Sequence, residues 1–135
     1  CGPWQGQQEI STRLARGGSR VLFVENTAAR GARPSDAGRI IRRVLKCFAS
    51  HGVKYLTLYA FSTENWSRPR AEVRGLFRLL GEAIDREVDD LHREGVKLNH
   101  LGTLDGLAPS LKKRVLDAMA LTKDNTGLTL NLAFN

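Results

Sequence analysis

From about residue 35 onward the chain alternates between helical and strand-like hydrophobic patterns, and this alternation constrains the fold more than any other feature. The first pattern predicts a helix that Gly52 ends, and its apolar face consists of Ile40, Ile41, Val44, Leu45 and Phe48. Two further helices are predicted over 71–93 and from Pro109, and the predicted strands cover 55–60, 96–101 and 127–134. Strands that alternate with helices form βαβ units. We therefore predict an α/β fold, in which a partial parallel sheet carries helices on its faces.

Residues 1–40 do not continue this regular pattern. Val21–Val24 is the one short strand-like run before residue 35, and the sequence around it, rich in Arg, Ala, Gly, Ser and Pro, is typical of loops. The net charge is +7, and residues 1–50 carry nine Lys and Arg against three Asp and Glu. A nucleic-acid surface would interleave basic with aromatic residues, which this segment does not do. We therefore favour a disordered basic arm over a nucleic-acid module, and we expect no nucleic-acid partner.

Composition and residue spacing exclude several classes of protein. The chain is 41% hydrophobic, enough for a core, but it has no run of about 18 apolar residues, which excludes a membrane span. The cysteines form no CxxC pair and the histidines lie far apart, so the sequence predicts no metal-ligand set. No signal peptide is visible, and the default expectation is the cytoplasm. Because the chain ends one residue after an apolar strand, we also expect an incomplete domain.

Polar and aromatic side chains concentrate in residues 61–69, directly after the first of the three predicted strands. In parallel sheets, ligands bind beyond the carboxyl ends of the strands. Arg68 offers a planar fork that suits phosphate oxygens, and Ser62 and Asn65 can add neutral donors. Composition alone leaves two interpretations open, an anion site or a structural loop that holds one ion pair.

The run from Gly52 to Val73, which contains Phe-Ser-Thr-Glu-Asn-Trp-Ser-Arg-Pro over 61–69, closely resembles the cis-prenyltransferases. These are isoprenyl transferases of the undecaprenyl and decaprenyl diphosphate synthase type. Residues 95–102 and 122–135 resemble the two following strands of the same family, so the resemblance covers about residues 41–135. It implies a partial cis-prenyltransferase domain over 41–135, preceded by a poorly matched, loop-rich or out-of-family segment over 1–40.

The resemblance implies a transferase of prenyl groups, which condenses isopentenyl diphosphate with an allylic diphosphate such as farnesyl diphosphate. Its product would be a Z-polyprenyl diphosphate that serves as a lipid carrier, and Mg²⁺ would assist the departure of diphosphate. The residues that it implies as catalytic are Ser62, Asn65 and Arg68. The residues that it implies as substrate-binding are Phe61, Ser62, Trp66, Arg68 and Glu72. Candidates for an apolar product tunnel are Leu76, Phe77, Leu80 and Ile84, although an ordinary helix–sheet core would use the same side chains.

Two parts of the family site have no counterpart in this sequence. The N-terminal Asp-Gly-Asn-Gly-Arg-Trp-Ala loop, whose aspartate binds Mg²⁺, is not here, and its aspartate would fall near Gly17. The later Tyr-Gly-Gly-Arg stretch and the glutamate beyond it would follow Asn135. We therefore expect no metal ligands in this chain and little or no activity from the chain alone.

These departures leave alternatives for the role of the chain. One is a non-catalytic cis-prenyltransferase-like partner subunit, and another is that residues 1–40 are translated out of frame or come from a mis-joined exon or a fusion. The resemblance further implies a homodimer or heterodimer in complete relatives, and a cytoplasmic protein with peripheral membrane contact.

Overall fold

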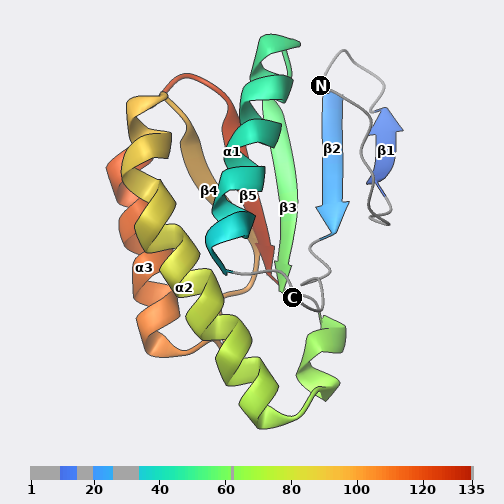
Figure 1. The fold of residues 1–135 in the computed structure, drawn as a ribbon, viewed down its shortest axis with the longest axis vertical. Helices are drawn as coiled ribbons and strands as arrows, with labels where there is room; N and C mark the ends of the chain where they lie inside the picture. Colours follow the sequence, from blue (N-terminus) through green and yellow to red (C-terminus); the bar gives the residue numbers. More distant parts are fainter. Residues whose placement is uncertain (1–9, 15–19, 26–33, 62, 135) are drawn as a thin grey trace.

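The computed structural model describes residues 10–14, 20–25, 34–61 and 63–134, which form an α/β arrangement (Figure 1). The strands are β1 (Ile10–Leu14), β2 (Arg20–Glu25), β3 (Tyr55–Phe61), β4 (Lys97–Gly102) and β5 (Thr129–Phe134). The helices are α1 (Pro34–Ser50), α2 (Arg70–Arg93), α3 (Pro109–Thr122) and the short 3₁₀ helix η1 (Thr63–Ser67).

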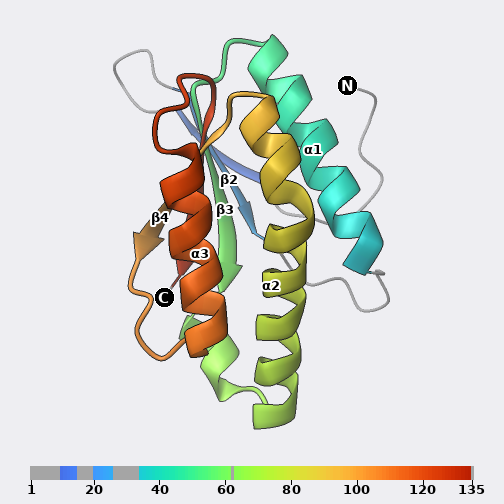
Figure 2. The same cartoon turned by 90° about the vertical axis from the view of Figure 1, so that its left-hand side faces the viewer.

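The five described strands form one sheet in the order β1-β2-β3-β5-β4. Strands β2, β3, β5 and β4 run parallel, and β1 pairs antiparallel with β2. Helices α1, α2 and α3 lie side by side over the same face of this sheet (Figure 2). The prediction of an α/β fold built on a parallel sheet is therefore confirmed, and α1, α2 and α3 form a single layer on one face of that sheet.

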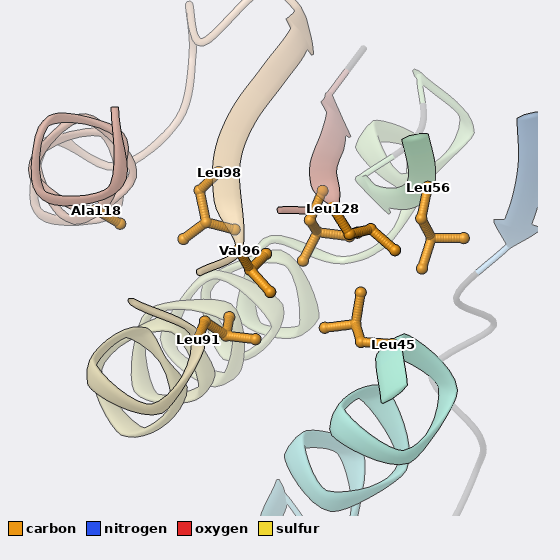
Figure 3. Close-up of a cluster of buried hydrophobic side chains, with 8 residues drawn as sticks. Leu45, Leu56, Leu91, Val96, Leu98, Ala118 and Leu128 are labelled. Carbon is orange, nitrogen blue, oxygen red and sulfur yellow. The ribbon is translucent and has the colours of Figure 1, made fainter. Parts of the chain in front are cut away.

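The core divides into two clusters along the strands. The amino-end cluster lies where the parallel strands begin, and its buried members are Leu45, Leu56, Leu91, Val96, Leu98, Ala118, Leu128 and Leu130 (Figure 3). The carboxyl-end cluster lies where the strands finish, and its buried members are Phe61, Val73, Phe77, Leu104, Leu107, Leu111, Val115 and Phe134. Because Leu56 and Leu98 are both in register with Leu130, one row of leucines faces the helices across three strands.

Thr122 joins α3 to the sheet at the amino-end cluster. It has no exposed surface, and its hydroxyl donates to the Ala118 carbonyl at 2.9 Å. The same oxygen accepts a hydrogen bond from the Leu98 N–H at 2.9 Å. A buried polar side chain is stable when its donor and acceptor are both used, and Thr122 meets that condition.

Most of the predicted elements match the structure closely. Strand β2 includes the predicted run Val21–Val24, and α2 begins one residue before the predicted helix over 71–93. Helix α1 begins at Pro34 and keeps Leu45 at the centre of its apolar face, while the side chain of Ile40 lies outside the described residues. The sequence pattern did not predict β1. Among the described residues, no helix has the length and apolar character needed to cross a membrane.

Candidate functional site

The candidate site lies at the carboxyl end of the sheet, where β3 passes into η1 and then α2. Phe61 ends β3 and is 1% exposed, which fixes the start of the loop in the core. Within η1 the Ser67 hydroxyl donates to the Glu64 carbonyl at 2.7 Å, and the Arg68 N–H donates to the Asn65 carbonyl at 3.2 Å. Pro69 then precedes α2, in the extended backbone conformation that proline favours. The local sequence therefore forms a tight connection between a buried strand and a long helix.

Three aromatic rings hold this connection against the core. The rings of Phe61 and Trp66 meet edge to face, with their centroids 4.9 Å apart, and the Trp66 and Phe77 centroids are 5.8 Å apart. Trp66 remains 41% exposed, so its indole also borders solvent. Gly106, in the loop after β4, lies against this ring, since a Cβ on Gly106 would stand 3.2 Å from it. The loops that follow β3 and β4 thus meet at Trp66.

Arg68 is the accessible cation of the connection. Its Nη1 lies 3.8 Å from Glu72 Oε2, and the two side chains are 47% and 57% exposed. An exposed ion pair at this distance contributes little stability, so the guanidinium can exchange Glu72 for another anion at small cost. The first turn of α2 starts two residues later, and its amide groups place partial positive charge at the same end of the sheet. The arrangement suits a phosphate or diphosphate group.

An apolar cavity of about 80 Å³ lies between the helices and the sheet. It extends from the carboxyl-end cluster, at Val115 and Phe134, to the amino-end cluster, at Leu91 and Leu130. Its other lining residues are Ile41, Leu58, Ala60, Leu80, Ala83, Ile84, Glu87, Leu98, Asn99, Ala118, Met119 and Leu132. The lining is almost wholly apolar, so the cavity suits a hydrocarbon chain.

The structure brings most of the predicted site residues to one end of the sheet. Phe61, Asn65, Trp66, Arg68 and Glu72 all lie on or beside η1 and the first turn of α2. Asn65 is half-buried there. The remaining catalytic candidate, Ser62, lies outside the described residues.

The four tunnel candidates separate into two pairs. Leu80 and Ile84 line the cavity. Leu76 and Phe77 pack in the carboxyl-end cluster beside it, and Phe77 contacts Phe61 with ring centroids 5.0 Å apart.

Sequence reasoning missed two contributors to this region. Gly106 gave no signal because its role depends on contact with Trp66 and on a backbone φ of +83°, neither of which a sequence pattern records. Glu87 stands among Asp85, Asp89 and Asp90, a pattern that predicts a solvated helix face, yet it is 5% exposed and lines the cavity. Its position three residues after Ile84, on the apolar stripe of α2, was the available signal.

Carboxylates and imidazoles do not cluster in the described part of the chain. No group of three His, Cys, Asp or Glu side chains there lies close enough to hold a metal ion. Beside Arg68, the Glu72 carboxylate already pairs with the guanidinium.

Comparison with known proteins shows the family to which the chain belongs. The Prenyltransf family model, which describes undecaprenyl diphosphate synthases, matches residues 27–135. An isoprenyl transferase from Clostridium perfringens is 50% identical over 97 residues, which are 72% of this chain and 38% of that protein. The (2E,6E)-farnesyl-diphosphate-specific ditrans,polycis-undecaprenyl-diphosphate synthase from Pasteurella multocida is 45% identical over 97 residues, which are 72% of this chain and 40% of the relative. The chain thus spans about two fifths of the length of these curated relatives.

Solved structures agree with this assignment. The crystal structure of a probable undecaprenyl diphosphate synthase from Campylobacter jejuni superposes with a TM-score of 0.70 at 25% identity, over 84% of this chain and 51% of that one. A lavandulyl diphosphate synthase from Lavandula x intermedia, solved with dimethylallyl diphosphate, gives a TM-score of 0.65 at 25% identity, over 75% of this chain and 42% of that one. From its sequence and its fold, the chain belongs to the undecaprenyl diphosphate synthase family of prenyltransferases.

Proposed function

We propose that this chain forms the part of a cis-prenyltransferase that binds an allylic diphosphate, such as farnesyl diphosphate, and the growing hydrocarbon chain. The complete enzyme would extend this primer with isopentenyl diphosphate to give a Z-polyprenyl diphosphate lipid carrier. The observation that carries the proposal is the position of Arg68, half exposed and loosely paired, beside the start of α2 and at the end of the sheet from which the apolar cavity extends inward. An allylic diphosphate has a charged head group and an apolar tail, so it needs a cationic site next to an apolar cavity.

The polar residues of the connection would act on the diphosphate. When the allylic carbon–oxygen bond breaks, negative charge grows on the departing diphosphate, and donors fixed in advance lower the free energy of that state. Arg68 would bind two phosphate oxygens through its planar fork, and Asn65 would add an amide donor. Ser62, which the family resemblance includes among the catalytic residues, would act at the same group. Phe61 would hold the loop in place from the core, the partly exposed Trp66 would cover the first carbons of the primer, and Glu72 would orient Arg68.

The apolar cavity would receive the hydrocarbon tail. Leu80 and Ile84 line it directly, and Leu76 and Phe77 would support its wall from the carboxyl-end cluster. Elongation adds apolar surface at each step, and burial of that surface releases about 25 cal/mol per Å². Product growth and tunnel occupation are therefore linked.

Magnesium is expected from the family, in which the cation supplies charge neutralisation for the diphosphate. The described residues do not by themselves fit a magnesium site, because no three His, Cys, Asp or Glu side chains among them converge. Mg²⁺ prefers an octahedral set of oxygen ligands. We therefore assign no step of the reaction to a metal held by these residues alone.

Titration of the full chain with farnesyl diphosphate tests the proposal, with tryptophan fluorescence as the readout. Arg68→Ala should weaken binding about tenfold or more, because a hydrogen bond to a charged group contributes about 1.5–3 kcal/mol. Arg78→Ala is the matched control, since Arg78 is exposed on α2 and pairs with Glu82 at the same 3.8 Å and the same i,i+4 spacing. The control should bind like the wild type. Equal losses in the two variants would contradict a specific role for Arg68.

An activity assay separates the proposal from the partner-subunit alternative. With farnesyl and isopentenyl diphosphates and Mg²⁺, we expect little or no product from the chain alone. If the chain instead increases the output of a complete synthase without binding farnesyl diphosphate itself, the partner-subunit function replaces the proposed one. Dimerisation, a cytoplasmic location and peripheral membrane contact stay predictions from the family.

A further inference from the structure

Charge is distributed along helix α2 in the reverse of the order that favours a helix. Residues 68–82 contain two glutamates and four arginines, which are Arg68, Arg70, Arg74 and Arg78. Residues 83–94 contain five acidic residues and two arginines. Acidic side chains stabilise the first turn of a helix and basic side chains the last. Arginines in the first two turns of α2 are therefore unfavourable for the helix itself, and its stability does not explain them.

The acidic residues of the second half contribute to the packing of α2. Four of the five pair with basic side chains of α1 or α3. Asp85 Oδ2, for example, lies 3.2 Å from Arg114 Nε on α3. Glu87, which is 5% exposed, lies 2.7 Å from Arg42 Nε on α1. The charges at this end of the helix are therefore largely neutralised within the protein.

Arg70 and Arg74, in the first half, are not neutralised in this way. Neither makes an ion pair in the described part of the chain, and both are exposed. Glu72, which lies between them in the sequence, pairs with Arg68. Because Arg70 and Arg74 are four residues apart on one side of the helix, their like charges repel. The pair thus costs the helix some stability and presents two positive charges to solvent.

Both arginines lie at the end of the molecule that holds the candidate diphosphate site. The first turns of α2 project past the start of α3 (Figure 2). The Cα atoms of Arg68 and Arg70 are within about 8 Å of each other, and Arg74 lies about 6 Å further along the helix axis. At an ionic strength of about 0.1 M the Debye length is about 10 Å. The two charges therefore act on an anion that approaches Arg68.

We propose that Arg70 and Arg74 steer allylic diphosphates toward Arg68, and that they raise the association rate without contacting the bound substrate. This inference rests on the proposed function, since it takes Arg68 as part of the diphosphate site. Fixed charges beside a site increase the local concentration of an oppositely charged ligand. The dissociation rate depends on contacts that form after arrival, so the two arginines should leave it unchanged.

Stopped-flow mixing of the full chain with farnesyl diphosphate tests this inference, with tryptophan fluorescence as the readout. The observed rate is measured against ligand concentration, so that the slope gives the association rate and the intercept gives the dissociation rate. In Arg70→Gln/Arg74→Gln the association rate should fall about threefold at about 0.1 M salt. The difference from the wild type should vanish at about 1 M salt, where the Debye length is about 3 Å. The dissociation rate should be that of the wild type at both salt concentrations.

A charge-conserving variant separates steering from direct binding. Arg70→Lys/Arg74→Lys keeps both charges but loses the planar fork that holds phosphate oxygens, so under steering it should associate and dissociate like the wild type. Thermal melts followed by circular dichroism should show no loss of stability in the Gln variant, because it removes a repulsion between like charges.

Arg86→Gln/Arg93→Gln is the matched control for net charge. It also removes two arginines from α2, but the nearer of them lies about 24 Å from Arg70 along the axis, more than two Debye lengths at about 0.1 M salt. This control should associate like the wild type. Farnesol supplies the matched control ligand, because it carries the same tail without charge, and its association rate should be the same in all the variants.

The outcomes separate this inference from the proposed function. If farnesyl diphosphate binds the Gln variant at the wild-type association rate at about 0.1 M salt, steering is overturned and the diphosphate site stands. Faster dissociation in the Gln or Lys variant would also overturn it, because the arginines would then contact the ligand. An equal fall with farnesol or in the Arg86/Arg93 control would overturn it as well. If farnesyl diphosphate does not bind the wild type, both proposals fail.

Discussion

The polar side chains beside the two core clusters differ in their burial and in how firmly they are paired. At the amino-end cluster, Thr122 is fully buried and its hydroxyl both donates and accepts a hydrogen bond. At the carboxyl-end cluster, Arg68 and Glu72 are about half exposed and lie 3.8 Å apart. Both ends are apolar inside, and Leu56 and Phe61 are equally inaccessible. The difference therefore lies in the polar groups at the edges of the clusters and not in packing.

Under the proposed function, the amino-end cluster would serve stability and the carboxyl end of the sheet would serve binding. A polar group whose hydrogen bonds are satisfied within the protein has nothing left to offer a ligand. Arg68, which is only loosely paired with Glu72, can still bind an anion, and exchanging Glu72 for that anion costs little free energy. Substitutions at the two ends should therefore separate unfolding free energy from ligand affinity.

The largest expected effect is at the amino-end cluster. Leu56→Ala should lower the free energy of unfolding by about 2–5 kcal/mol, because the side chain has no exposed surface and its removal leaves a cavity. Urea denaturation measures this loss. Leu101→Ala, on β4 of the same sheet, removes a leucine that is 42% exposed and should cost much less. Similar losses in the two variants would contradict the assignment of Leu56 to a tightly packed cluster.

Removal of the Thr122 hydroxyl, at the same amino-end cluster, should cause a smaller loss of unfolding free energy. Thr122→Val keeps the shape of the side chain but leaves the buried Leu98 N–H without its acceptor, which should cost about 1–3 kcal/mol. Thr126→Val, at an exposed position, should change stability by less than about 0.5 kcal/mol. Chemical denaturation of both variants provides the comparison, and an unchanged midpoint for Thr122→Val would show that the hydroxyl is dispensable.

The smallest expected effect is a difference in tryptophan emission between alanine substitutions at two glycines, one at each end of the sheet. Gly52 and Gly106 have φ values of +74° and +83°, so alanine at either should cost about 1–2 kcal/mol. Open space surrounds Gly52, whereas a Cβ at Gly106 would meet the Trp66 ring. Gly106→Ala alone should therefore shift tryptophan emission, measured in a Trp4→Phe background so that Trp66 is the reporter. An equal shift in Gly52→Ala would refute the contact.

The sequence predicted the elements better than it predicted their contacts. Helix α2 followed from hydrophobic periodicity, because one face of it is buried. Strand β3 followed from a short run of β-branched and aromatic residues. Strand β1 escaped prediction, since five residues at the edge of a sheet give too short a pattern. The partners of an element are decided by residues far away in the chain, and local periodicity carries no record of them.

The candidate site shows the same division. Residues 61–69 were predicted to form a site because polar and aromatic side chains concentrate there and because the segment resembles a known family. The described members of that segment do lie together. Glu87 could not be distinguished from its acidic neighbours by composition, because its burial depends on Arg42, 45 positions earlier in the sequence. A charged residue that is buried because of a partner far away in the sequence is easily predicted, wrongly, to lie on the surface.

The length of helix α2 sets the distance between residues at its two ends. It runs without interruption from Arg70 to Arg93, and it carries Glu72 in its first turn and Glu87 near its far end. At about 1.5 Å per residue, these two positions are roughly 22 Å apart along the axis. Backbone hydrogen bonds fix that span, so side-chain substitutions cannot stretch it. The helix therefore sets the distance between the Arg68–Glu72 pair and the Arg42–Glu87 pair, and only the insertion or deletion of residues within it would change that distance.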